Sequence, residues 1–403
     1  NWYTFTSKIF RLKRIATLTK NESYWDKDCK LFDTVTIKLV EDVTVGYSLY
    51  DTGEIDTIDL AEANLRAIYE DENNQYHDYL TEKLPNKFSY QMKFNYAKKN
   101  EDGSDDTNWN TAIANEAFRQ SIYYGLDLTK TYERANMINP LSCENTAYTM
   151  KGLVYFSDGT EYVDRVEELI ELPESNGKKM RRLDKEKAEE LKKQAIEELS
   201  AKGVKFPVEM DYYIPAGSQL ALDSATVLQE NFAECLGDDY IKLNIGTYVS
   251  SLTQEVIDPS LQSVVMNGWG ADYGDVQNFL GQETYGEETA YYSMNYTNIN
   301  DATDPELIAT WKEFTDLVNK ANAITGDLDE RYEAYAQAEA YMLKHAMTIP
   351  YNLEISWQLS KINDYSVSHA IYGMQNAKYK NWETSVDAYT TEDYEKFAEE
   401  FNK

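Results

Sequence analysis

The sequence predicts an α/β protein that is divided into at least two lobes. The chain has 403 residues, and single hydrophobic cores rarely grow beyond about 250–300 residues. Helical and strand patterns follow one another along the chain, which is typical of layered α/β lobes. Aromatic residues make up 13% of the chain, and they supply the buried area that disordered chains lack.

The N-terminal part of the chain, residues 8–60, predicts β-strands. Apolar and polar residues alternate over 35–39 with the period of two that a half-buried strand requires. The segment IDTIDL at 55–60 shows a second, shorter alternation.

The middle of the chain predicts two helices, the second followed by a strand. Residues 115–127 place apolar side chains near helical spacing. From Leu183 onward apolar residues recur every three or four positions until Gly203, a residue type common at helix C-termini. Apolar residues then alternate with charged ones over 204–212, so the period changes from 3.6 to 2. Helix followed by strand is the repeating unit of a layered lobe.

Two more helices and a strand are expected near the C-terminus. The run Asp-Pro-Glu at 304–306 provides a cap, a first-turn proline and an acidic residue for a helix that continues to about residue 320. Residues 328–345, rich in Ala and Tyr, predict a second helix. Apolar residues alternate over 347–357, which predicts one long strand.

The charge of the chain limits its partners. It carries 39 basic and 70 acidic residues, a net charge of -31. This charge repels phosphate backbones, so we expect no nucleic-acid partner. A cationic or zwitterionic ligand is easier to accommodate.

Cysteine and histidine offer no framework for disulfides, metals or cofactors. The three cysteines include no C-x-x-C pair, so they predict no disulfide scaffold. The three histidines are too scattered to predict a metal site. No apolar run approaches the roughly 20 residues that a membrane-spanning helix needs. The residues concerned are Cys29, Cys143, Cys235, His77, His345 and His369.

Motifs of the common hydrolases and nucleotide-binding enzymes are absent. The sequence contains no G-x-x-x-x-G-K-[ST], no G-x-S-x-G and no H-E-x-x-H. A carboxylate pair for glycoside hydrolysis could be drawn from the 70 acidic residues, but no feature of the sequence brings two of them together.

The stretch NGWGADYGDVQNFLGQ at 267–282 is the strongest candidate for a binding loop. It contains four glycines, and it places Asp272 between Trp269 and Tyr273. Glycine is frequent where another molecule approaches the main chain. Taken by themselves, these residues favour a simpler interpretation, in which Asp272 is a turn or cap residue and Trp269 belongs to the core.

Four segments, in this order and spacing, resemble the extracellular solute-binding proteins of peptide-importing ABC transporters, in particular the streptococcal-type oligopeptide-binding lipoproteins. NESYWDKDCKLFDTVTIKLVED at 21–42 is similar to the family's Tyr-Trp-Asp segment with its following strand. DTGEIDTIDL at 51–60 resembles its Gly-Glu-Ile-Asp turn. NEAFRQSIYYGLD at 115–127 resembles its Phe-Arg-Gln helix, and GWGADYGDVQNFL at 268–280 resembles its Gly-Trp-x-x-Asp-Tyr motif.

The sequence also departs from the family pattern. Gly274 and Val276 stand where the family usually has prolines, and Leu128 stands where it commonly has arginine. Family members normally begin with a lipid-modified cysteine and a large N-terminal region, and nothing similar precedes Asn1. We therefore expect this chain to be the C-terminal portion of such a protein.

The resemblance implies a two-lobe fold like that of periplasmic binding proteins, of the large peptide-binding class, with an incomplete first lobe. Residues 1–87 would belong to the first lobe, 88–345 would form the second, and 346–403 would return to the first. The lobes would close on a ligand like other hinged binding proteins.

The resemblance also implies a site and a function. An extended peptide would be held between the lobes mainly through its backbone, with Asp272 pairing with its α-ammonium. Gly268 and Gly270 would allow the peptide backbone to come close, while Trp269 and Tyr273 would form walls of the pocket. The protein would be no enzyme, would use no cofactor, and would deliver oligopeptides to an ABC permease.

The resemblance further implies a location at the extracellular face of the cell membrane, through a lipid anchor expected to be absent from this chain, or in the periplasm. Two alternatives stay open. The same fold could bind another solute, such as a nickel chelate, haem or an oligosaccharide, although the few histidines disfavour metals. The protein could instead be a surface adhesin or chaperone-like protein.

Arg119, on the Phe-Arg-Gln helix, is expected to form a surface or interlobe ion pair.

Overall fold

The computed structural model of the chain describes two compact units. It describes residues 3–5, 15–26, 28–40, 43–85, 88–172, 174–175, 178–179, 181–367 and 379–401. The first unit comprises Asn1–Asn86, Arg134–Ser142 and Glu354–Lys403. The second comprises Lys87–Glu133 and Cys143–Leu353. Compared with the expected divisions at 87/88 and 345/346, the second unit continues to Leu353, and residues 134–142 belong to the first.

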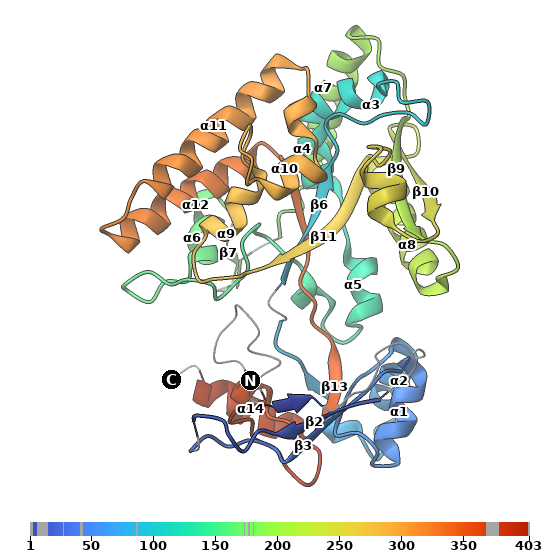
Figure 1. The fold of residues 1–403 in the computed structure, drawn as a ribbon. Coiled ribbons are helices and arrows are strands. Elements are labelled where there is room, and N and C mark those ends of the chain that lie inside the picture. The colour runs from blue at the N-terminus through green and yellow to red at the C-terminus, as the bar shows by residue number, and fades with distance from the viewer. Residues whose placement is uncertain are drawn as a thin grey trace. The chain divides into compact units, whose positions relative to one another are not determined.

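The first unit contains two small antiparallel sheets and short helices (Figure 1). One sheet has the order β1-β2-β3, and the other has the order β4-β13-β5. The strands are β1 (Tyr3–Phe5), β2 (Ile15–Lys20), β3 (Thr34–Lys38), β4 (Thr57–Asp59), β5 (Thr81–Glu82) and β13 (Trp357–Ser360). The helices are α1 (Val43–Asp51), α2 (Glu62–Tyr69), η1 (His77–Tyr79), α13 (Asp364–Val367) and α14 (Thr391–Phe401). Its core consists of Tyr50, Leu60, Leu65, Ile68, Leu80 and Leu359.

The second unit is built around a three-stranded sheet and a parallel strand pair. Strand β6 (Phe88–Phe94) lies in the middle of the sheet, and it pairs antiparallel with β11 (Val264–Gly270) and with β12 (Ile349–Asn352). Strands β9 (Val208–Pro215) and β10 (Ile241–Tyr248) form the parallel pair. A short hairpin joins β7 (Glu174–Ser175) to β8 (Lys178–Lys179).

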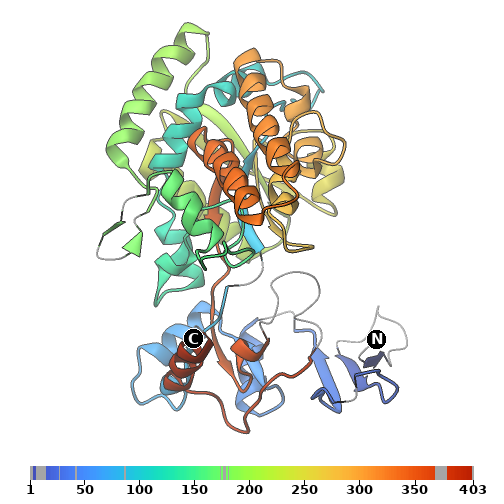
Figure 2. The ribbon, with the colours of Figure 1, turned by 90° about the vertical axis from the view of Figure 1, so that its left-hand side faces the viewer.

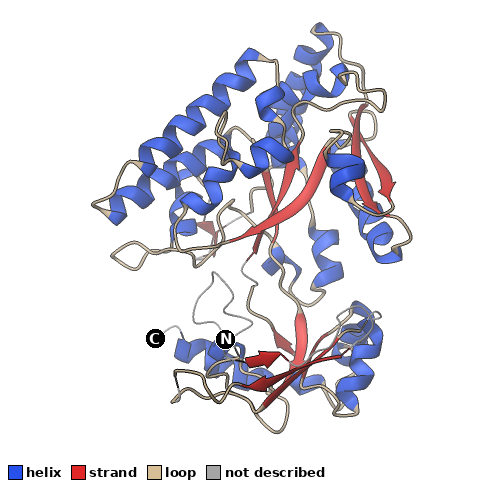
Figure 3. Cartoon of the chain, viewed as in Figure 1, coloured by secondary structure: helices blue, strands red, loops and turns tan. Residues whose placement is uncertain are grey.

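Helices surround these strands, as Figure 3 shows. The two long orange helices α11 (Pro305–Asn322) and α12 (Leu328–Lys344) lie side by side in Figure 2. Helix α5 (Thr129–Ala135) spans a boundary between the units. The α-helices of the second unit are α3 (Thr107–Ala114), α4 (Glu116–Gly125), α6 (Tyr162–Leu169), α7 (Lys185–Ala201), α8 (Gln219–Leu236), α9 (Gln277–Leu280), α10 (Tyr291–Asn295), α11 (Pro305–Asn322) and α12 (Leu328–Lys344). Single-turn helical segments are η2 (Pro140–Cys143), η3 (Thr253–Ile257), η4 (Gly281–Glu283) and η5 (Ile299–Asp301).

The four helices expected from periodicity are present as α4, α7, α11 and α12. Their starts follow from capping chemistry, because a side-chain oxygen satisfies backbone N–H groups that have no partner within the helix. Asp184 accepts from Lys187 N, and Asp304 accepts from the backbone nitrogens of the first turn of α11. Asp327 does the same for α12.

Two predictions about strands are wrong. Residues 43–51, inside the region expected to form strands, form α1, whose Tyr50 is buried in the core of the first unit. Tertiary packing there overrides the strand preference of the two valines. The single strand expected over 347–357 is two strands, β12 and β13, which belong to different units. An alternating pattern cannot show that a strand leaves one sheet and enters another.

Arg119 is buried and does not form the expected ion pair. It is 1% exposed. Its Nη1 atom donates to the carbonyls of Ile113 and Ala114 at 2.8 and 2.9 Å, and Nη2 donates to the carbonyl of His345 at 3.3 Å. These carbonyls lie at the C-terminal ends of α3 and α12, where helices leave acceptors unsatisfied. Burial lowers the pKa of Arg119.

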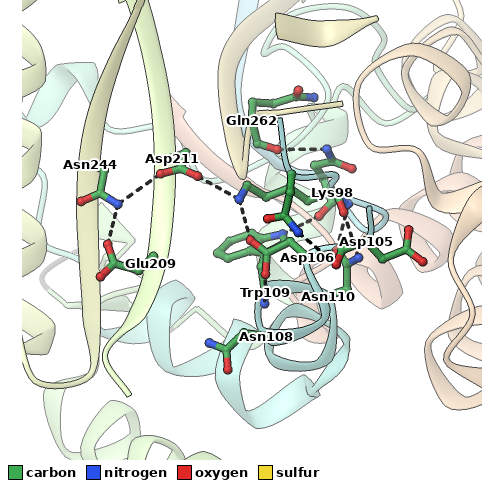
Figure 4. Close-up of polar contacts among 12 residues, drawn as sticks. Lys98, Asp105, Asp106, Asn108, Trp109, Asn110, Glu209, Asp211, Asn244 and Gln262 are labelled. Atoms are coloured by element: carbon green, nitrogen blue, oxygen red, sulfur yellow. Dashed lines mark hydrogen bonds and ion pairs between the residues drawn. The ribbon is translucent and has the colours of Figure 1, made fainter. Parts of the chain in front are cut away.

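A buried lysine joins α3 to the parallel strand pair (Figure 4). The ammonium of Lys98 lies 2.6 Å from a carboxylate oxygen of Asp106 and 2.8 Å from one of Asp211. Asp106 also caps α3 through Trp109 N, and Asn244 of β10 donates to Asp211 at 3.1 Å. Lys98 is only 5% exposed, so the two carboxylates compensate the loss of water around its charge. These contacts hold α3, β9 and β10 in one arrangement.

The turn after β10 yields a pH-dependent prediction. The carboxylate of Glu255 accepts backbone N–H groups of Val249, Ser251 and Ser250 at 2.7–2.9 Å, and these bonds lower its pKa from 4.5 to about 2. Because the folded state lowers the pKa of Glu255, its ionised carboxylate stabilises the fold at every pH above 4.5. This contribution is lost as the pH falls from 4.5 towards 2. Glu255→Gln is therefore expected to lower the melting temperature at neutral pH, with a difference from the parent that shrinks at about pH 3.

Thermal unfolding at several pH values checks this expectation. Glu197→Gln is the control, because Glu197 is an exposed acid on α7. A Glu255→Gln difference that stays constant between neutral and acidic pH would contradict the assigned cause.

Candidate ligand-binding site

The candidate site follows the end of β11, a strand at the edge of its sheet. Among the described residues, β11 pairs only with β6. Gly268 lies opposite Tyr90, and a Cβ atom on Gly268 would stand 2.7 Å from Cδ1 of that ring. A Cβ on Gly270 would stand 2.8 Å from Cε1 of Phe88. Packing therefore explains why glycine occupies both positions, because any larger residue would collide with an aromatic ring of β6.

The loop after β11 is organised by Asn278, a buried residue of α9. Its Oδ1 accepts from the indole Nε1 of Trp269 at 3.0 Å and from the backbone nitrogen of Asp272 at 2.8 Å. Its Nδ2 donates to Oδ2 of Asp272 at 3.3 Å. One amide thus fixes both the indole and the carboxylate. Asp272 itself is exposed.

The far side of the same loop is anchored by an ion pair. Asp275 accepts two hydrogen bonds from the guanidinium of Arg331, at 3.0 and 3.1 Å. Arg331 also donates to the carbonyls of Ala321 and Asn322 at the end of α11. A bidentate arginine–carboxylate pair gives geometric specificity as well as energy. The position of the loop is therefore tied to a long helix.

Trp269 is part of an aromatic cluster with α10. Its ring centroid lies 6.1 Å from that of Tyr291 and 5.7 Å from that of Tyr292. The hydroxyl of Tyr292 donates to the carbonyl of Gly268 at 3.0 Å. Tyr273 is 47% exposed, and its hydroxyl donates to Gln277. The cluster thus supports both the strand and the loop.

A buried ion pair lies beneath this cluster. The ammonium of Lys93, on β6, lies 2.7 Å from Glu283 Oε1 and 2.8 Å from the hydroxyl of Tyr148. It also lies 4.0 Å from the ring centroid of Tyr292. Lys93 is 1% exposed and Glu283 is 2% exposed. Burial lowers the pKa of Lys93, while Glu283 opposes that effect.

The structure brings Trp269 and Asp272 together through Asn278, and it leaves Tyr273 at the surface of the same loop. Sequence reasoning missed Asn278, Tyr291 and Tyr292. Asn278 stands in the quoted stretch, and its place directly before the apolar residues Phe279 and Leu280 is the one signal that could have pointed to it. In the described part of the chain, no group of three His, Cys, Asp or Glu side chains could hold a metal ion.

Comparison with known proteins identifies relatives of this chain. The model of the bacterial extracellular solute-binding proteins, family 5 Middle, matches residues 3–290. The oligopeptide-binding protein SarA of Streptococcus gordonii is 24% identical over 99% of this chain. The oligopeptide-binding protein AliA of Streptococcus pneumoniae is 22% identical over 98%. The chain spans 64% of the length of each of these relatives.

Solved structures confirm the predicted α/β, two-lobe fold class. The substrate-binding domain of an oligopeptide ABC transporter from Bacillus anthracis matches with a TM-score of 0.65 and 17% identity, over 95% of this chain and 64% of that one. Listeria monocytogenes OppA bound to peptide matches with a TM-score of 0.63 and 19% identity, over 93% of this chain and 62% of that one.

The family model covers well over half of the chain, so the predicted family is confirmed. No helix in the described ranges combines the length and apolar character needed to cross a bilayer. The chain belongs to the bacterial extracellular solute-binding proteins of family 5.

Proposed function

We propose that this chain binds oligopeptides and that Asp272 accepts the peptide's α-ammonium. The observation that carries the proposal is the state of the Asp272 carboxylate. It is exposed, and Asn278 holds its Oδ2 atom, while Oδ1 accepts no hydrogen bond from another residue in the described part of the chain. An acceptor oxygen held in one orientation is suited to an ammonium group, which every unmodified peptide presents at its N-terminus.

The strand before Asp272 supports the same proposal. An extended peptide adds to a sheet edge through main-chain hydrogen bonds, which do not depend on its sequence. Strand β11 is such an edge in its three-stranded sheet. Gly268 and Gly270 carry no side chains of their own, so a bound backbone would meet the rings of Tyr90 and Phe88 beside them, with Trp269 and Tyr273 next to it.

The relatives of this chain support a role in peptide transport. Their names describe oligopeptide-binding proteins, and one structural match is the substrate-binding domain of an oligopeptide ABC transporter. We therefore propose that this protein acts at the extracellular face of a bacterial membrane, held there by a lipid anchor, or in the periplasm. There it would pass peptides to an ABC permease.

Calorimetric titration with short peptides tests the proposal. A charge-assisted hydrogen bond contributes about 1.5–3 kcal/mol, which corresponds to a change of about 10- to 150-fold in Kd. Asp272→Asn is expected to weaken the binding of free-amine peptides by this factor. N-acetylation of the same peptides is expected to weaken their binding to the parent chain by a similar factor.

Asp316→Asn is the matched control, because Asp316 is an exposed acid on α11. Its peptide affinity is expected to equal that of the parent. Equal affinity of the parent for free and acetylated peptides would contradict the role of Asp272. A folded chain that binds neither form would contradict peptide binding itself.

A further inference from the structure

An exposed apolar surface adjoins the proposed ammonium site. Tyr291 is 46% exposed and Met294 is 50% exposed. They are three positions apart on α10, so they lie on the same side of the helix. Tyr291 in turn packs against Trp269, which is partly exposed. Tyr291 thus lies on the side of α10 that also carries Met294 and contacts Trp269, and these three side chains are named here the α10 surface.

The polar groups around the α10 surface are bound within the protein. The only polar atom of the Trp269 side chain donates to Asn278, and the hydroxyl groups of Tyr291 and Tyr296 share a hydrogen bond. Met294 has only a thioether. An indole with a satisfied N–H and a thioether offer apolar, polarisable contacts to a ligand, rather than hydrogen bonds.

The α10 surface is close to Asp272. The indole nitrogen of Trp269 and the backbone nitrogen of Asp272 share one acceptor, Oδ1 of Asn278. These two nitrogen atoms therefore lie no more than about 6 Å apart. In a peptide, the α-ammonium and the first side chain are attached to the same Cα atom. A peptide whose ammonium pairs with Asp272 can thus reach the ring of Trp269 with its first side chain.

We infer that the α10 surface selects peptides whose first residue is aromatic or aliphatic. Burying such a side chain against Trp269, Tyr291 and Met294 removes apolar area from water on both partners. A polar first residue loses hydration at the same place and finds no hydrogen-bonding partner on the indole or the thioether. The inference rests on the proposed function, since it uses the ammonium at Asp272 to place the first side chain.

Titration with three tetrapeptides tests the inference: Phe-Ala-Ala-Ala, Ser-Ala-Ala-Ala and Ala-Ala-Ala-Phe. The parent chain is expected to bind the first about tenfold more tightly than the second, because about half of an aromatic side chain becomes buried. The third peptide is expected to bind like the second, because its phenylalanine lies far from the ammonium.

Two variants and one control connect this preference to the α10 surface. Tyr291→Ser is expected to reduce the ratio of the Phe-first to the Ser-first affinity to about threefold or less. Met294→Ser is expected to reduce it as well, and it serves as an independent test if Tyr291→Ser fails to fold. Tyr155→Ser removes an exposed tyrosine from another part of the second unit, and it is expected to leave the ratio unchanged.

The outcomes separate this inference from the proposed function. If free-amine peptides bind and acetylation weakens their binding, but Phe-first and Ser-first peptides bind equally, the α10 surface is not a subsite and the role of Asp272 stands. Preference for phenylalanine at either end of the peptide, or a ratio unaffected by both variants, would also overturn the subsite. If no peptide binds, both proposals fail.

Discussion

Replacing Lys93 with methionine is expected to lower the free energy of unfolding of the second unit by about 3–5 kcal/mol. The substitution leaves the carboxylate of Glu283 buried, with the hydroxyl of Tyr148 as its remaining partner at 3.0 Å. An unpaired buried charge is costly because water no longer solvates it. Urea unfolding, followed by tryptophan fluorescence, measures the change.

The double variant Lys93→Met with Glu283→Leu distinguishes the cost of an unpaired charge from the loss of packing. Replacing both charges by apolar groups of similar volume is often nearly neutral. The double variant is therefore expected to recover most of the stability that Lys93→Met loses. If it is as unstable as the single variant, the ion pair is not the source of the effect.

The second large effect is expected at Arg119. Arg119→Met removes the donors to the carbonyls of Ile113, Ala114 and His345 while keeping a side chain of similar length. A fully buried carbonyl left without a partner costs about 1–3 kcal/mol, and the bond to Ile113 is buried while those to Ala114 and His345 are partly buried. We expect a loss of about 3–5 kcal/mol in the free energy of unfolding, measured by urea unfolding.

Arg165→Met is the matched control for this prediction. Arg165 is a partly exposed arginine that pairs with Glu333 and Glu168. Exposed ion pairs contribute about 0–1 kcal/mol, so this variant is expected to change stability little. Similar losses in the two variants would show that the buried carbonyls around Arg119 are not the cause.

Helices with their own caps could be predicted from the sequence, whereas strands that depend on distant partners could not. The pattern over α7, α11 and α12 is local, since apolar spacing and a capping aspartate lie within one segment. Helix α1 depends instead on the burial of Tyr50 in a core that includes distant residues such as Leu359. The division of residues 347–357 into β12 and β13 depends on pairing with β6 in one unit and with β4 and β5 in the other.

The candidate site shows the same limit. The acid and its aromatic neighbours stand in one short stretch, so the sequence indicated Asp272, Trp269 and Tyr273. The structural reason for Gly268 could not be predicted, because the ring of Tyr90 that fills the space beside it comes from β6, a strand far away in the chain. The role of Asn278 depends on side-chain geometry that no spacing rule encodes.

The buried pair of Lys93 and Glu283 connects stability with the proposed function. Lys93 contacts the ring of Tyr292, and the hydroxyl of Tyr292 donates to Gly268 in the strand that leads to Asp272. A charged pair so close to the strand of the proposed site holds one arrangement of the surrounding side chains. The polar groups beneath the strand are therefore part of the support of the site.

A crystal structure of this chain with a bound free-amine tetrapeptide tests the central claim most directly. The proposal predicts that the peptide's N-terminal nitrogen lies about 2.7–2.9 Å from Oδ1 of Asp272, while Asn278 keeps its contact with Oδ2. A peptide bound with its N-terminal nitrogen away from Asp272 would contradict the claim.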